Sequence, residues 1–131
     1  MIEGVITDEF LSQLFPPERA DEFFEALYGG AETGAFDIAL KLRGFNESEN
    51  LLFLDFVLTE RPGKCMACSL TYGLPPVFQR HPVININGMI KKIEEKLKKD
   101  WIAEEWSLGS TTVVSKDINC IPLVIKLKRR Q

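Results

Sequence analysis

The pattern that most constrains the fold is a pair of adjacent strand-like segments at residues 35–43 and 51–59. From Phe36 to Leu42 every second residue is apolar, as in a strand with one buried face. Residues 51–59, LLFLDFVLT, are apolar almost throughout, which predicts a strand that is covered on both faces or lies centrally in a sheet. Asp55 interrupts this run, so it should be exposed or have a hydrogen-bonding partner. The polar segment GFNESEN between the two has the composition of a hairpin connection.

Helical periodicity predicts helices on either side of this hairpin. Thr7 followed by two acidic residues is typical of a helix start, and Pro16-Pro17 separates two successive apolar stripes. The predicted helices span residues 7–15, 17–28 and about 86–97. Asn85 or Asn87 would cap the third of them.

Further strands complete the expected fold. Residues 64–72 predict a third strand of an antiparallel meander, and residues 101–108 fit a strand better than a continuation of the preceding helix. The β-branched TTVV and the alternating residues 118–128 predict the C-terminal strands, with Pro122 favouring an edge position or a bulge. The sequence therefore predicts one α+β domain over residues 1–131, with a four- or five-stranded antiparallel sheet. The order of elements, the size and the acidic character are similar to those of bacterial secretion chaperones, in architecture alone.

Composition narrows the class of protein. The 131 residues are 45% hydrophobic and 27% charged, and no apolar run reaches the ~18–20 residues that would span a bilayer. The N-terminus lacks the pattern of a signal peptide, and three cysteines suggest reduced thiols, so we expect a cytoplasmic protein without membrane association. The net charge of −3 and the pI of about 5.2 argue against a nucleic-acid partner.

Charge is unevenly distributed along the chain. Residues 1–60 carry 13 acidic and 3 basic side chains, a balance of −10, whereas the remaining 6 acidic and 13 basic residues give +7. Two interpretations are open. The halves fold against each other and their surface charges interleave, or the second half presents a basic surface to an acidic partner.

Cys65 and Cys68 form a CxxC pair, a spacing used in zinc sites and in thiol–disulfide exchange. His81 and Cys120 are the residues that could complete a zinc site. On the predicted strand 64–72, however, residues three apart point to opposite faces, so the two thiols could not share a metal. We therefore expect structural cysteines and no cofactor, and keep a metal- or thiol-dependent protein or enzyme that uses these four residues as the alternative.

Residues 74–87 carry the remaining candidate sites. We predict an anionic-ligand pocket at the start of the third helix, where donors gather beside the backbone N–H groups of a helix N-terminus. Its candidate residues are Arg80, His81, Asn85 and Asn87. The stiff loop GLPPVF could drape over the core or contact a protein, and its candidate contact residues are Leu74, Pro75, Pro76, Val77 and Phe78.

No motif in the chain specifies a reaction. The leading interpretation is a small, cytoplasmic, non-enzymatic interaction or regulatory module that binds a protein or a small anionic ligand. Self-association as a dimer is compatible with this interpretation.

Overall fold

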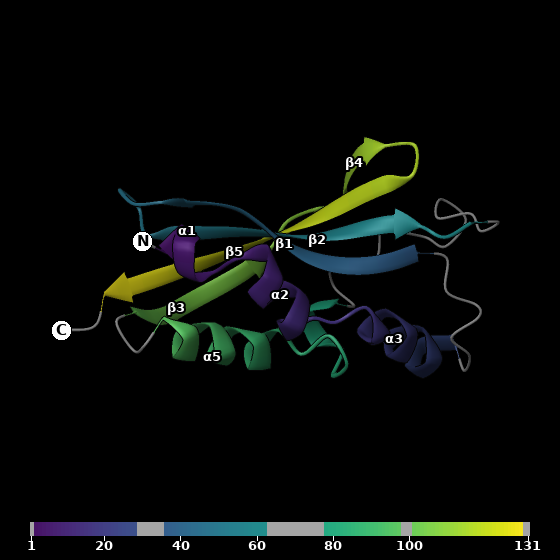
Figure 1. Cartoon of the computed structure of the whole chain (residues 1–131), viewed down its shortest axis with the longest axis horizontal. Helices are drawn as coiled ribbons and strands as arrows, with labels where there is room; N and C mark the ends of the chain where they lie inside the picture. The colour runs from purple at the N-terminus through teal and green to yellow at the C-terminus, as the bar shows by residue number, and fades with distance from the viewer. Residues whose placement is uncertain (1, 29–35, 63–77, 98–100, 130–131) are drawn as a thin grey trace.

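The computed structural model describes residues 2–28, 36–62, 78–97 and 101–129 (Figure 1). The helices in these ranges are α1 (Ile2–Val5), α2 (Asp8–Leu14), α3 (Glu18–Tyr28) and α5 (Ile86–Lys96). The strands are β1 (Phe36–Asn46), β2 (Leu51–Glu60), β3 (Trp101–Leu108), β4 (Thr112–Ser115) and β5 (Ile118–Arg129). All pairings are antiparallel, in the order β1-β2-β5-β3, with β4 also paired to β5. The predicted α+β class and antiparallel sheet are confirmed, and the expected strand at residues 64–72 lies outside the described residues.

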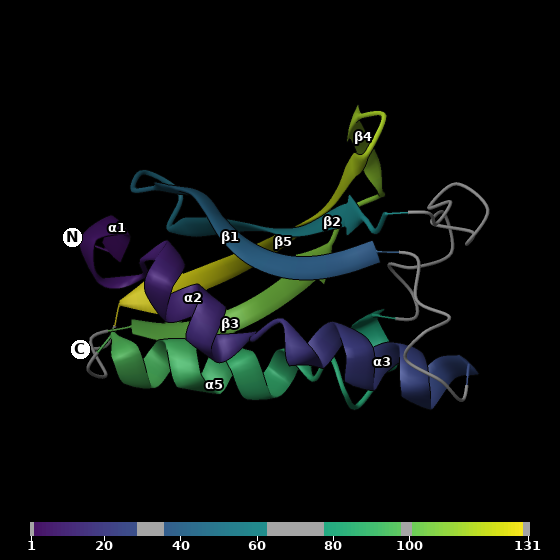
Figure 2. The same cartoon turned by 45° about the vertical axis from the view of Figure 1, so that its right-hand side comes forward.

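The two predicted N-terminal helices are present and join as one bent helix. Thr7 caps α2, since its hydroxyl oxygen accepts a hydrogen bond from the Phe10 N–H at 3.1 Å. At the bend the N–H of Arg19 donates to the carbonyl of Pro16 at 2.9 Å, which starts α3 after the two prolines. The bend keeps α2 and α3 on the same face of the sheet as α5 (Figure 2).

The β1–β2 hairpin turns where the polar segment predicts it. The side-chain oxygen of Asn46 accepts from the N–H groups of Ser48 and Glu49 at 3.0 and 3.2 Å. Asn50 then takes φ 55°, a left-handed conformation that Asn tolerates better than most residues, and β2 begins at the next residue. The polar connection thus supplies both the side-chain acceptor and the backbone conformation that the turn requires.

Strand β5 is central, which corrects the edge position that Pro122 predicted. β2 pairs with one side of β5, while β3 and β4 share the other side. The Pro122 carbonyl accepts from the N–H of Gly109 at 2.8 Å, just beyond the end of β3. Proline has no backbone N–H, and the nitrogen of Pro122 faces the gap between β3 and β4, where the polypeptide turns. A central strand therefore accommodates this proline without losing a hydrogen bond to a neighbouring strand.

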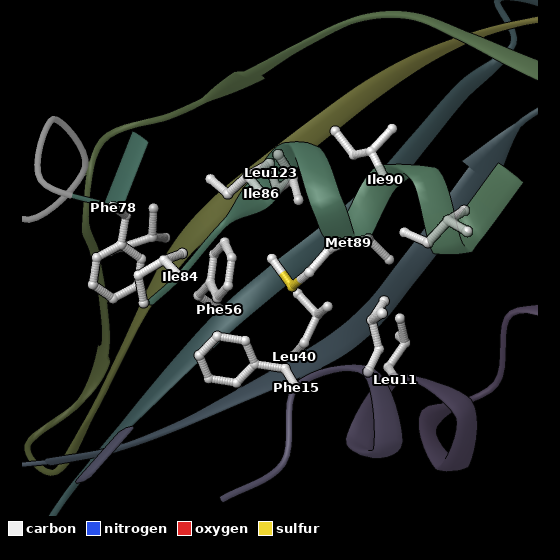
Figure 3. Close-up of a cluster of buried hydrophobic side chains, with 14 of the residues drawn as sticks. Leu11, Phe15, Leu40, Phe56, Phe78, Ile84, Ile86, Met89, Ile90 and Leu123 are labelled. Carbon is white, nitrogen blue, oxygen red and sulfur yellow. The ribbon is translucent and has the colours of Figure 1, made fainter. Parts of the chain in front are cut away.

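A single hydrophobic core lies between the sheet and the helices (Figure 3). The most buried helix-facing residues of β1, β2 and β5 are at most 2% exposed: Phe36, Ile38, Leu40, Leu52, Leu54, Phe56, Leu58, Ile121, Leu123, Ile125 and Leu127. Phe56 is the aromatic centre, with edge-to-face contacts to Phe15 and Phe78 at centroid distances of 5.8 and 5.2 Å. Such pairs add stabilisation beyond the area that they bury.

Arg61, just after β2, ties α3 to β1. Its guanidinium donates to Asp37 at 2.9 Å and to Asp21 at 2.7 Å. Burial lowers the pKa of Arg61, but the two carboxylates outweigh burial and raise it above its ordinary value. The cation therefore joins an acidic helix to the first strand, and at this point the charges of the two halves of the chain interleave.

Candidate interaction surface

The second face of the sheet carries no helical layer in the described part of the chain (Figure 2). In β2 the residues alternate between buried on the helix side and half-buried on the other side. The half-buried apolar residues on this second face, which we call the open face, are Ala39, Leu51, Phe53, Val57, Ile102, Ile118, Pro122 and Val124. The open face therefore has an apolar centre over which the described part of the chain places no helix.

One ion pair lies within the open face. Arg43 donates to both oxygens of Asp55, at 3.0 Å through Nε and at 2.7 Å through Nη2. The Asp55 side chain is only 15% exposed, and the guanidinium of Arg43 is its hydrogen-bonding partner. The sequence-based expectation that Asp55 needs such a partner is therefore met. Lys41 stands opposite Asp55 on β1, and the exposed Lys126 and Lys128 border the face on β5. Glu105 of β3 stands opposite Lys126, and Asp37 of β1 is exposed on the same face, so four basic residues (Lys41, Arg43, Lys126 and Lys128) face three acidic ones (Asp37, Asp55 and Glu105).

The outer edges of β1 and β3 are each interrupted in the same way. β1 has an irregularity between Leu42 and Gly44, and the Leu42 N–H donates to the carboxylate of Asp8 on α2 at 3.2 Å. β3 has an irregularity of the same kind between Ala103 and Glu105. There the Ala103 N–H donates at 2.6 Å to Glu94 on α5. A bulge together with an occupied N–H hinders pairing with a further strand at both edges.

β4 shares a register irregularity with these two edges, but none of its described hydrogen bonds goes to a helix. All its residues are exposed, and Val113 and Val114 have 63% and 60% of their surface accessible, the largest exposure of any described large apolar residue. The register slips between Val113 and Ser115, which explains why two consecutive valines are both exposed. The β4–β5 hairpin rises from the sheet on the side away from α3 and α5 (Figures 1 and 2).

The four predicted ligand residues lie around the start of α5, and His81, Asn85 and Asn87 each have a different hydrogen-bond partner. Asn85 caps the helix in a left-handed conformation (φ 48°), and its side-chain oxygen accepts from the Gly88 N–H at 3.2 Å. His81 Nδ1 accepts from the Val83 N–H at 3.2 Å, and its ring meets Phe23 edge to face. The contacts of both residues thus organise the turn into α5, and the predicted anion pocket stays a prediction.

Asn87 belongs to a different place, a groove between α5 and β3. Its side-chain oxygen accepts from the Trp106 indole N–H at 2.8 Å. The groove holds about 590 Å³ and is lined by Asn87, Ile90, Lys91, Glu94, Ala103, Glu104, Glu105 and Trp106. Three carboxylates against one ammonium make this groove unsuited to an anion, and Arg80 is exposed outside it.

Phe78 is the one residue of the predicted GLPPVF contact that the structure describes. It is fully buried, with its ring edge to face against Phe23 as well as Phe56. Its side chain therefore belongs to the core and is not available to a partner in this fold. Residues 74–77 lie outside the described part of the chain.

The structure describes only one of the three cysteines, Cys120. Cys65 and Cys68 lie outside the described residues, whereas Cys120 is 8% exposed beside Val57. Burial raises the pKa of the Cys120 thiol and Asp55 raises it further, with a smaller opposing effect of Arg43. Within the described ranges, no three potential ligands among His, Cys, Asp and Glu gather around one point. A raised pKa keeps the Cys120 thiol protonated and weakly nucleophilic at neutral pH.

The sequence pattern of β2 does not by itself reveal the open face. Leu51, Phe53 and Val57 indicated a central strand or one covered on both faces, and only the placement of the described helices shows that none of them covers the second face. Among the described residues, no helix is both long and apolar enough to cross a membrane. Comparison with protein-family models finds no matching family, and searches of curated proteins and of solved structures find no similar protein.

Proposed function

We propose that the protein is a small, cytoplasmic, non-enzymatic interaction module that binds a partner protein with the open face of its sheet. The observation that carries the proposal is the apolar centre of that face, with Phe53 and Val124 half-buried and no described helix above them. Covering such a centre removes apolar surface from water at about 25 cal/mol per Å². The ion pair Arg43–Asp55 within the face adds a polar contact that favours one orientation of the partner.

The charges around the apolar centre favour an acidic partner. Lys41, Lys126 and Lys128 are exposed, and their ammonium groups can meet carboxylates at the rim while the apolar centre is buried. The acidic α2 and α3 lie on the opposite side of the sheet (Figure 2), so they do not repel such a partner from the open face.

Site-specific photocrosslinking in cells tests the proposal. A benzoylphenylalanine at Ser107, which is exposed and pairs with Val124, should give an adduct of defined mass. The same group at the exposed Gln13 of α2 should not. The charge reversal Lys126→Glu with Lys128→Glu should weaken the adduct at least tenfold.

The matched control is the reversal Lys91→Glu with Lys92→Glu, on the exposed side of α5. It changes the net charge equally and should leave the adduct from Ser107 unchanged. Equal adducts from Ser107 and Gln13, or equal loss in both reversals, would refute recognition by the open face.

A further inference from the structure

Among the described strands, β4 has an edge that none of the described helices interrupts, so a further strand can pair with it. Asp8 and Glu94 occupy N–H groups at the irregularities of β1 and β3. The described hydrogen bonds of β4, by contrast, run to β5 and to the neighbouring Ser110. An exposed strand edge is a template for pairing with a further chain, and proteins usually protect it with charges or covering elements.

The sequence around β4 lacks such protection. Residues 109–115, GSTTVVS, contain no charged residue and no proline, and four of the seven are β-branched. The first charges are Lys116 and Asp117 in the hairpin turn, and they have opposite signs. The two exposed valines stand within this uncharged segment.

We propose that a second copy of the chain occupies this edge, with β4 pairing antiparallel to β4 of the partner across a two-fold axis. A two-fold axis pairs a segment with the same segment of the other copy. Any charged residue within it would therefore lie near a residue of the same charge. An uncharged β-branched segment avoids this repulsion. When Val113 faces Val114 of the other copy, Lys116 falls opposite Thr111 and Asp117 falls opposite Ser110.

The geometry of the β4–β4 pairing sets the expected affinity of the dimer and the relative placement of the two open faces. Four paired residues bury less than the roughly 1,200 Å² at which stable interfaces begin, so we expect a dissociation constant on the order of 100 μM. The two-fold axis of an antiparallel pair stands perpendicular to the sheet. Both open faces would therefore lie on the same side of one continuous sheet. The pairing does not depend on the proposed function, because it needs only the chain itself.

Sedimentation velocity of the reduced full-length protein from 5 to 500 μM tests this inference. The wild type should shift from monomer to dimer across this range. Val113→Lys with Val114→Lys, and separately Val113→Asp with Val114→Asp, should each stay monomeric because like charges face each other. An equimolar mixture of the two variants should recover the dimer, with at least tenfold tighter association than either variant alone.

These positions are exposed, so both variants should keep the circular dichroism spectrum and thermal midpoint of the wild type. A wild type that is monomeric at 500 μM would overturn the inference. So would charged variants that associate like the wild type, or a mixture that stays monomeric. The reversal of Lys126 and Lys128 should leave this dimer intact, which separates a failure here from a failure of the proposed function.

Discussion

Glu94 should be the most informative single residue for the closure of the β3 edge. Its carboxylate accepts the Ala103 N–H at 2.6 Å, across the irregularity of the edge strand. Glu94→Ala removes a charge-assisted hydrogen bond worth about 1.5–3 kcal/mol. Both groups are half-buried, so water can partly replace the lost acceptor and the lower half of that range applies. Alanine regains a few tenths of a kcal/mol in helix propensity.

The expected net loss is about 1–2 kcal/mol in the free energy of unfolding, or about 3–6 °C in thermal midpoint for a chain of this size. The two tryptophans, Trp101 and Trp106, flank Ala103 on β3, so urea unfolding followed by tryptophan fluorescence reports this strand directly. Circular dichroism of the same samples follows the whole fold, and the two transitions should coincide.

The neighbouring Glu95 provides the matched control, since it is exposed on the same helix. Glu95→Ala should change the free energy of unfolding by less than about 0.5 kcal/mol. Glu94→Gln keeps an acceptor without the charge and should lose about half as much as Glu94→Ala. The reasoning fails if Glu94→Ala and Glu95→Ala are equally stable.

Two other sites give sharp expectations. A Cβ on Gly109 would lie 2.7 Å from Pro122 Cγ, so Gly109→Ala should cost about 1–3 kcal/mol in urea unfolding and much less in a Pro122→Ala background; equal costs in both would contradict the contact. In a Cys65→Ser, Cys68→Ser variant, iodoacetamide should alkylate Cys120 more slowly at pH 8 than it alkylates an unhindered thiol, because burial raises the pKa of Cys120. The folded thiol keeps its proton to higher pH than the unfolded one. The contribution of the Cys120 thiol to the free energy of unfolding is therefore complete below the pKa of the unfolded state and lost as pH rises through the pKa of the folded state. Alkylation of Cys120 as fast as that of free cysteine would refute the raised pKa.

Local patterns in the sequence were sufficient for most of the secondary structure. The alternation in residues 36–42 and the periodic apolar stripe of α5 each bury one face, and burying a face is what secondary-structure periodicity reports. The caps at Thr7 and Asn85 follow from short side chains that reach backbone N–H groups a few residues away. The strand at residues 101–108 was also correctly preferred over a longer helix.

Neighbours across the sheet are what sequence could not supply. Pro122 indicated an edge position or a bulge, yet it lies in regular register in a central strand, because the gap between β3 and β4 is a property of two other segments. Phe78 was a candidate contact residue, yet Phe23 and Phe56 enclose it. Neither outcome is encoded within a few residues of the position concerned.

The sequence by itself determined the class of fold, the helix caps and the hairpin turn, since each depends on interactions between residues close together in the chain. Only the tertiary structure decided which sheet face the described helices leave uncovered and which strand edge they leave uninterrupted. Both depend on where α2 and α5 pack, and through them on where the carboxylates of Asp8 and Glu94 reach the sheet. Burial depends on the packing of the whole chain. The alternating sequence of a strand indicates that its two faces differ, and the packing of distant elements decides which face meets solvent.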